Sequence, residues 1–149
     1  LKYTALRYAN VYGKRQDPRG EAGVVAIFTN KLLKNQQPAI YGDGKQTRDF
    51  VYVGDVVSAN ILASTKIDNQ AVNIGTQIET SVNELFAILK EITRYNGKPE
   101  YKAARPGELI RSCLDTDMAK TLGWQPKYNL KQGLKETVKW VKKYSQRSY

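Results

Sequence analysis

Residues 4–12 read TALRYANVY, a run rich in β-branched and aromatic residues that Gly13 brings to an end. Such a run predicts one β-strand. Apolar side chains occupy both of its faces, which is typical of a strand buried in a parallel sheet. The remaining sequence offers few partners for it, and an open edge of this kind would favour aggregation. We therefore expect the sheet to continue in residues that precede Leu1.

Beyond this strand, amphipathic helical patterns alternate with short extended stretches. The clearest helix start lies at Ser81 and Glu84, which form a capping box ahead of an apolar stripe with a 3.6-residue period. We expect Gly97 to end this helix, and Asp55 and Asp115 to act as N-caps of two others. The expected helices cover residues 22–34, 55–64, 81–96, 115–122 and 130–144, and the expected strands cover residues 38–42, 49–53, 71–75 and 101–104. This alternation indicates an α/β fold with some α+β character.

Composition narrows the class of protein. A chain of 149 residues with 41% hydrophobic and 26% charged residues suits one soluble globular domain. It has no run of 18 apolar residues, so we expect no membrane-spanning helix. One cysteine and no histidine exclude an internal disulfide and remove the commonest metal ligand and general base. We therefore expect a cytoplasmic protein without a metal site.

The net charge of +10 raises the possibility of a nucleic-acid partner. Its distribution argues against one. Lysines recur on one side of the segment 131–142, opposite the apolar residues Leu134, Val138 and Val141, as on the solvated face of an ordinary helix. We expect no nucleic-acid binding, although a positive field can concentrate a small anionic ligand.

Self-contained catalytic sets are missing from the sequence. Without histidine, neither a Ser-His-Asp nor a Cys-His arrangement is possible. Neither the glycine-rich dinucleotide fingerprint nor the P-loop pattern occurs. We expect no catalytic residue within these 149 residues.

Several motifs together resemble a known family. They are LRYANVYG at 6–13, RQDP at 15–18, GEAGVV at 20–25, IYGDG at 40–44, TRDFVYV at 47–53, NIG at 73–75, RPGE at 105–108 and LGW at 122–124. The ordered set resembles extended short-chain dehydrogenase/reductases of the NAD-dependent epimerase/dehydratase family, and within it most closely the UDP-glucose (UDP-galactose) 4-epimerases.

The resemblance implies that residues 1–149 are the nucleotide-sugar-binding, C-terminal portion of an extended Rossmann-type protein. One or two strands would then belong to the parallel sheet of an N-terminal NAD-binding half. The family's glycine fingerprint and catalytic Tyr-xxx-Lys pair lie in that half. Tyr41 and Lys45 match the pair in letters, but the two glycines between them indicate a turn and not a helix, so we expect no catalytic role for them.

The resemblance also assigns the charged and aromatic binding residues. Arg48 and Arg105 match the positions that clamp the substrate diphosphate, for which the planar guanidinium fork is well suited. The alternative for Arg48 is a surface ion pair with Asp49. Tyr41 matches the residue whose ring stacks on uracil; the alternative is a core tyrosine. Glu108 matches an acidic residue that accepts hydrogen bonds from the ribose, or else is a solvated turn residue.

Further positions follow from the same resemblance. Asn10 would hydrogen-bond the sugar-phosphate part, and Val24 and Val25 would contact the nucleotide at a helix start, unless their side chains are simply core. Tyr8 and Ala9 would lie with their backbone against the nicotinamide of NAD.

These implications define the expected function. The complete protein would epimerise a UDP-hexose at C4 with NAD as a homodimer, and this chain would bind the UDP part while being inactive alone. A nucleotide-sugar dehydratase or decarboxylase of the same family stays open, as does a non-catalytic nucleotide-sugar-binding module.

Overall fold

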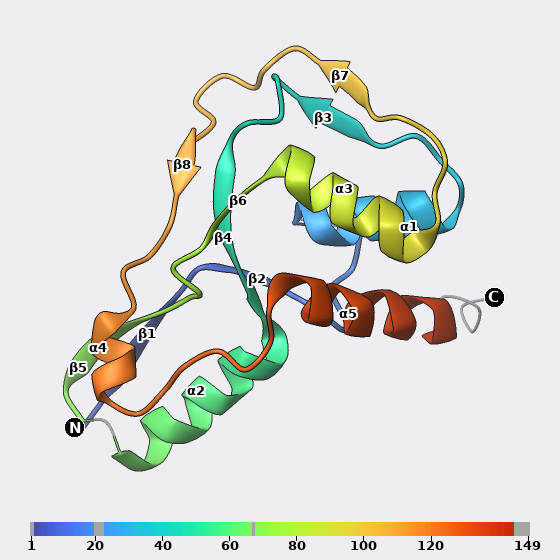
Figure 1. Ribbon diagram of the computed structural model, residues 1–149. Helices are drawn as coiled ribbons and strands as arrows, with labels where there is room; N and C mark the ends of the chain where they lie inside the picture. The colour runs from blue at the N-terminus through green and yellow to red at the C-terminus, as the bar shows by residue number, and fades with distance from the viewer. Residues whose placement is uncertain (1, 20–22, 67, 145–149) are drawn as a thin grey trace.

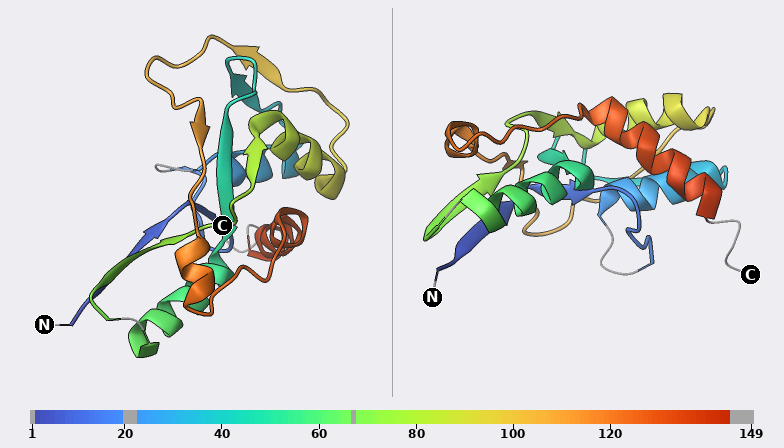
Figure 2. Two further views of the ribbon diagram at one scale, coloured as in Figure 1. Left: turned by 60° about the vertical axis from the view of Figure 1, so that its left-hand side comes forward. Right: turned by 90° about the horizontal axis from the view of Figure 1, so that it is seen from below.

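The computed structural model describes residues 2–19, 23–66 and 68–144. In chain order the elements are β1 (Thr4–Tyr8), β2 (Asn10–Tyr12), α1 (Val24–Leu33), β3 (Ala39–Tyr41), β4 (Thr47–Tyr52), α2 (Val53–Lys66), β5 (Gln70–Ile74), β6 (Glu79–Ser81), α3 (Val82–Thr93), β7 (Glu100–Lys102), β8 (Arg111–Ser112), α4 (Asp117–Thr121) and α5 (Leu130–Tyr144). Figures 1 and 2 show β1, β5, α2 and α4 at one end of the molecule and α1, α3 and α5 at the other, with β4 running between them.

Parallel strand pairs dominate the topology, which confirms the α/β prediction. β1 pairs with β5, β2 with β4, and β3 with β7, all in parallel. β4 also pairs with β8 in parallel and with β6 in antiparallel register. The strands β6 and β8 were not expected, because three and two residues are too few to show an alternating pattern.

Strand β4 separates two hydrophobic cores. Its side chains alternate between opposite faces, as in any strand. Phe50 and Tyr52 belong to a cluster with buried residues of α1, α3 and α5, whereas Val51 belongs to a second cluster with residues of α2, α4 and β5. A single six-residue strand therefore joins the two ends of the molecule.

The prediction of one continuous strand over residues 4–12 was wrong: the segment forms two strands, β1 and β2. The amide of Ala9 donates the last bond to the Ile74 carbonyl at 2.9 Å, and Asn10 then begins the pairing with β4. One straight strand could not stay in register with both β5 and β4, because these belong to different sheets. Among the described residues, the second edge of β1 has no strand partner.

Helix α3 begins at the predicted capping box. The Ser81 hydroxyl accepts from the Glu84 amide at 3.1 Å, and the Glu84 carboxylate accepts from the Ser81 amide at 2.7 Å. The helix ends at Thr93 and not near Gly97, because Arg94 adopts the left-handed conformation with φ of 60°. Arginine is an uncommon residue at such a position, so its sequence gave no stop signal.

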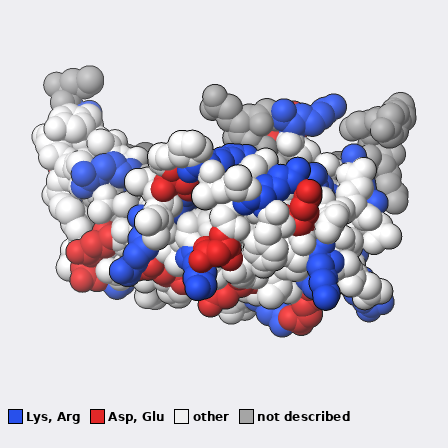
Figure 3. All heavy atoms as spheres, turned by 90° about the horizontal axis from the view of Figure 1, so that it is seen from above, with Lys and Arg blue, Asp and Glu red and all other residues white. Residues whose placement is uncertain are grey.

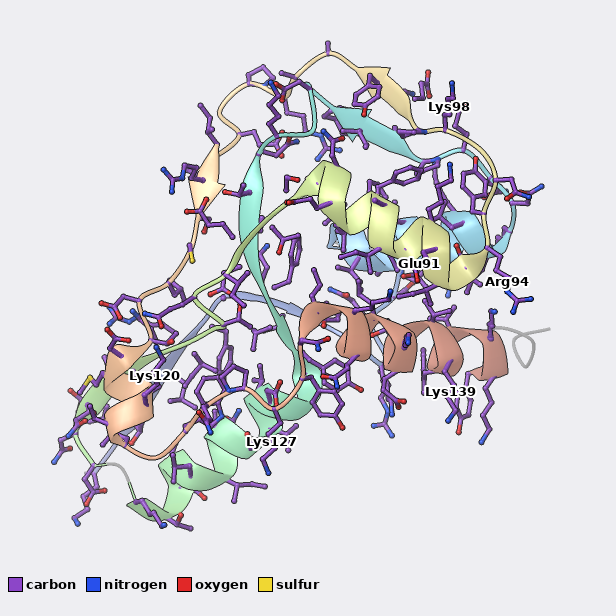
Figure 4. The ribbon with its side chains drawn as sticks, viewed as in Figure 1. Glu91, Arg94, Lys98, Lys120, Lys127 and Lys139 are labelled. Carbon is purple, nitrogen blue, oxygen red and sulfur yellow. The ribbon has the colours of Figure 1, made fainter. Side chains whose placement is uncertain are left out.

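Helix α5 lies along α3 with its lysines outward. Its entry is held by a reciprocal cap that was not foreseen: the Gln132 amide donates to Asn129 Oδ1, and the Asn129 amide donates to Gln132 Oε1. Glu91 of α3 points toward α5, where its carboxylate accepts from the Lys131 ammonium at 2.7 Å, while Lys139 points away from the helices (Figure 4).

The two aspartates that were expected to be N-caps have other roles. Helix α4 begins at Asp117, one residue after its N-cap Thr116; Asp115 precedes that cap, although its carboxylate accepts from the Asp117 amide at 2.9 Å. Helix α2 begins at Val53, so Asp55 lies inside its first turn and not at its N-cap. Gly123 follows α4 with φ of 87°, a conformation that glycine adopts without strain.

Asp55 is a buried tether between α2 and the segment that enters α5. Its side chain is 1% exposed, and its two carboxylate oxygens accept from the amides of Lys127 at 2.9 Å and Tyr128 at 3.2 Å. Trp124 strengthens this link, because its indole N–H donates to the Asp55 carbonyl and to the Ser58 hydroxyl.

Asp49, within β4, forms a second buried tether. It is also 1% exposed and accepts from the Thr76 amide at 2.8 Å, the Thr76 hydroxyl at 2.6 Å and the Gln77 amide at 3.2 Å. A Cβ on Gly75 would lie 2.3 Å from Asp49 Oδ2, so this turn needs glycine for close approach.

Replacing Asp55 should strongly destabilise the fold. Asp55→Ala leaves two part-buried backbone N–H groups without their acceptor, which should cost roughly 2–4 kcal/mol of unfolding free energy. Asp68→Ala is the matched control, because Asp68 is half-exposed in a surface ion pair with Lys2 and should cost at most about 1 kcal/mol. Urea or thermal unfolding of both variants measures the difference. An equal loss for both would show that Asp55 is not a tether.

Candidate functional site

A cavity of about 310 Å³ lies between α1, β3, the start of β4 and the loop that follows β7. It is lined by Asn10, Val24, Ile27, Phe28, Lys31, Ala39, Ile40, Tyr41, Gln46, Arg48, Val82, Arg105 and Glu108. This size falls at the lower end of the range for small-molecule pockets. Six of the seven substrate-binding residues predicted from the sequence are in this set.

The seventh residue, Val25, is not part of the cavity lining. Val24, Ile27, Phe28 and Lys31 share one face of α1 at helical spacing and line the cavity, whereas Val25 faces the core and is 2% exposed. The side chain of Val25 is therefore a core residue, as the alternative allowed, and a contact through its backbone amide at the helix start stays a prediction. The N-cap of α1, Gly23, offers no side-chain cap, and the first turn carries no acidic residue.

Arg48 extends from β4 toward the cavity, on the opposite face of the strand from buried Asp49. Its guanidinium donates to the carbonyls of Thr47 at 2.8 Å and Leu109 at 2.7 Å. Its other terminal nitrogen lies 3.7 Å from Glu108, and both side chains are mostly shielded. The ion pair is thus with Glu108, and the alternative of an Arg48–Asp49 pair is wrong for the described structure.

Arg105 covers the ring of Tyr41. The guanidinium carbon lies 3.9 Å from the ring centroid, a cation–π contact. Arg105 lowers the pKa of the Tyr41 phenol, first as a hydrogen-bond donor to it and then through its positive charge, and the charges of Lys102 and Lys31 lower it further. Arg48 and Arg105 both line the cavity, but in this structure only Arg105 lies on the tyrosine.

A glycine turn connects Tyr41 to Gln46, and both of these residues line the cavity. Gly42 and Gly44 have φ of 69° and 73°, which confirms that residues 41–45 form a turn and not a helix. Asn83 of α3 holds this turn, since its amide donates to the Asp43 carbonyl at 2.9 Å and its oxygen accepts from the Tyr101 hydroxyl. A Cβ on Gly44 would lie 2.2 Å from the Asn83 side chain.

Tyr8 and Ala9, the expected NAD contacts, lie outside this cavity. Tyr8 ends β1 with its ring 43% exposed and donates its hydroxyl to Asn60 of α2 at 3.0 Å. Ala9 has its amide committed to Ile74, which leaves only its carbonyl and methyl for another contact.

Sequence reasoning missed two polar lining residues, Lys31 and Gln46. Lys31 could have been found, because it stands seven residues after Val24 and therefore on the same helix face. Gln46 gave no signal, since its place beside Tyr41 depends on the fold of the glycine turn. Its amide nitrogen donates to the Tyr41 carbonyl at 2.9 Å.

The fold defines an α/β protein with parallel strand pairs and one cavity lined by the predicted residues, and comparisons with known proteins give the family. A model of the NAD dependent epimerase/dehydratase family matches residues 1–75, and this chain belongs to that family. A UDP-glucose 4-epimerase of Thermotoga maritima, solved with UDP-glucose, is 58% identical, with a TM-score of 0.94 over 96% of this chain and 47% of its own.

Two further similar proteins are also UDP-glucose 4-epimerases. A UDP-glucose 4-epimerase of Mycolicibacterium smegmatis is 46% identical over 93% of this chain and 45% of its own length. The structure of a Thermus thermophilus UDP-glucose 4-epimerase complex with NAD is 39% identical, with a TM-score of 0.88, over 97% of this chain and 48% of its own. The chain spans about half the length of the relatives it matches. Within the described ranges, no helix is long and apolar enough to cross a membrane.

The Tyr41–Arg105 contact can be tested by titration. Arg105→Met removes the guanidinium that favours the phenolate, so the pKa of Tyr41 should rise. Arg111→Met is the control, because Arg111 binds Glu79 and does not line the cavity. NMR of ring-labelled tyrosines across alkaline pH would report both. An unchanged Tyr41 pKa in Arg105→Met would contradict the contact.

Proposed function

We propose that this chain is the nucleotide-sugar-binding portion of a UDP-hexose 4-epimerase. One observation carries the proposal: residues from five separate segments, predicted one by one from sequence motifs, line a single cavity. The high similarity to UDP-glucose 4-epimerases along nearly the whole chain supports the same reaction.

The diphosphate would bind where α1 begins. The first turn of a helix presents free amides and the positive end of the helix dipole, and here the N-cap residue, Gly23, has no side chain to cap them. Arg48 supplies a guanidinium beside this end, and Asn10 supplies an amide from the strand paired with β4. A diphosphate would replace the distant Glu108 as the partner of Arg48, which frees Glu108 for the ribose hydroxyls.

The uracil would occupy the Tyr41 end of the cavity. In the free chain Arg105 covers one face of the Tyr41 ring. On binding, Arg105 would leave the ring for the diphosphate, and the base would take its place on the aromatic face. Both positions are favourable for arginine, because cation–π and charge-assisted contacts use the same flat fork.

The chemistry itself would need NAD, which would accept a hydride from the sugar C4 and return it. Among the residues of this chain, exposed Tyr8 and the carbonyl of Ala9 fit a contact with the nicotinamide end, and the remaining NAD contacts would come from outside these residues. The role of this chain is to hold the UDP while the sugar turns, so that binding energy far from the reacting carbon assists the step.

A dehydratase or decarboxylase of the same family would use the same clamp, and a non-catalytic binding module would use it without turnover. The sequence encoded upstream distinguishes them: a glycine-rich turn followed by a helical Tyr-xxx-Lys supports an enzyme.

The pocket argues against nucleic acid, and acidic and basic residues are interspersed over the face shown in Figure 3. A cytoplasmic homodimer remains our expectation for the complete protein.

Arg48→Ala should weaken UDP binding. Loss of a charged hydrogen bond to the diphosphate should cost roughly 1.5–3 kcal/mol, or about tenfold to a hundredfold in Kd. Arg19→Ala removes the same charge from an exposed loop and should change the Kd less than twofold. Calorimetric titration with UDP measures both. Equal affinities, with a lower melting temperature for Arg48→Ala alone, would make Arg48 a structural residue.

The purified 149-residue chain should not turn over UDP-galactose, even with NAD present, because it lacks a helical Tyr-xxx-Lys pair. A coupled assay for UDP-glucose tests this expectation. Sustained turnover would contradict it and would direct attention back to Tyr41 and Lys45.

A further inference from the structure

We propose that Asn83 is a positioning residue of the nucleotide site, which sets the span between the cavity wall that carries Tyr41 and the wall that carries Arg48. This inference rests on the proposed function, since it assumes that a nucleotide diphosphate reaches from one wall to the other. Asn83 itself is not among the residues that line the cavity.

The two walls belong to separate sheets. The base wall, made of β3, β7 and the turn at residues 42–44, contains a two-stranded parallel sheet in which Tyr41 lies opposite Lys102. These two strands run side by side at the top of Figure 1, above α3. Arg48 lies on β4, in the four-stranded sheet. The distance between Tyr41 and Arg48 is therefore not set by one ladder of strand hydrogen bonds.

The side chain of Asn83 contacts two parts of the base wall. Its amide nitrogen donates to the Asp43 carbonyl at 2.9 Å, and its Oδ1 accepts from the Tyr101 hydroxyl at 3.1 Å. Because a backbone carbonyl can only accept, the nitrogen of the side-chain amide must face Asp43, which fixes the orientation of this group. One side chain therefore fastens the turn and β7 to the start of α3.

Glycine at position 44 permits this close approach. A Cβ there would lie 2.2 Å from Asn83 Oδ1, and the residue has φ of 73°, which glycine adopts without strain. The backbone amide of Asn83 donates to the Gly44 carbonyl at 3.0 Å. The turn is thus shaped to receive Asn83 and not merely adjacent to it.

The other end of the link is β4. Strand β6 pairs with β4, where Thr80 lies opposite Arg48, and α3 begins directly after β6. Asn83 follows Thr80 by three residues, so it stands at a fixed position relative to the strand that carries Arg48. Asn83 consequently joins the base wall to β4 through a short and well-paired stretch of chain.

A fixed span matters most to a ligand that contacts both walls. Once one part of such a ligand is bound, the other part binds as if at a high local concentration, provided that the two sites stand at the matching distance. A shift of the walls removes this gain. A ligand that contacts only one wall has no such gain to lose.

Asn83→Ala tests the link, because it removes both side-chain hydrogen bonds and places a good helix former in α3. The three probes are UDP, uridine, which lacks the diphosphate, and inorganic pyrophosphate, which lacks the base. In Asn83→Ala the Kd for UDP should rise about fivefold to tenfold, whereas the Kd values for uridine and pyrophosphate should stay within about twofold of the parent values. Calorimetry for UDP and NMR shift titration for the two weaker ligands measure them.

Tyr101→Phe is a milder second variant. It removes one hydroxyl from a side chain that is 57% exposed, so the fold should be kept. The Kd for UDP should rise about twofold to fivefold, again without a matching change for uridine. If Asn83→Ala does not fold, the ratio of the UDP and uridine affinities in Tyr101→Phe decides.

Asn73→Ala is the matched control. The Asn73 side chain also donates its amide to a backbone carbonyl, that of Asp115 at 2.8 Å, and it does not line the cavity. This variant should keep the parent affinities for all three ligands.

The outcomes separate the inference from the proposed function. Equal weakening of all three ligands in Asn83→Ala would make Asn83 a structural residue and would overturn the inference. An unchanged Kd for UDP in both Asn83→Ala and Tyr101→Phe would overturn it too, while the proposed function stands. Failure of the folded parent to bind UDP would remove the proposed function, and the inference with it.

Discussion

Two buried carboxylates, one on β4 and one just after it, hold the structure together. Asp49 accepts three hydrogen bonds from the turn after β5, and Asp55 accepts two from the segment that enters α5. A buried carboxylate is costly unless it is fully hydrogen-bonded, so each one enforces the approach of its backbone partners. Together they fasten both ends of the molecule to the same strand and helix.

The cavity depends on that central position of β4. The strand directs Arg48 to the cavity and Asp49 to the opposite side, so the tether and the binding group are set by the same register. Two further lining residues, Tyr41 and Gln46, flank the glycine turn, which Asn83 of α3 fixes. The site is therefore built from the packed framework and not from one loop.

Sequence reasoning succeeded where the determining contacts were local. The Ser81–Glu84 box and the turn at residues 42–44 were predicted correctly, since their partners lie within three residues. It failed where distant partners decided the outcome: Asp55 looks like an N-cap, but its donors are Lys127 and Tyr128, some seventy residues later. The helix stop at Arg94 was missed because a residue with no preference for left-handed backbone occupies it.

For the candidate site, too, the sequence indicated which residues take part but not the contacts between distant segments. The motif resemblance identified Arg48, Arg105 and Tyr41, whose presence in one cavity needed the whole fold. It could not foretell that Arg105 would rest on Tyr41, because that contact joins a loop and a strand end 64 residues apart. The side chain of Val25 is in the core, which was the alternative to a nucleotide contact, because neighbouring helix residues face different directions; the expected contact through its backbone amide stays a prediction.

The change of strand partner at Ala9 fixes the distance between two sheets. Tyr8 belongs to the sheet of β1 and β5, and Asn10 belongs to the sheet of β2 and β4, with only one residue between them. Both neighbours are held by strand pairing, so the two sheets cannot slide apart without breaking hydrogen bonds on both sides. Because Ala9 alone separates the two pairings, the covalent length of one residue fixes the spacing between the two sheets at this point.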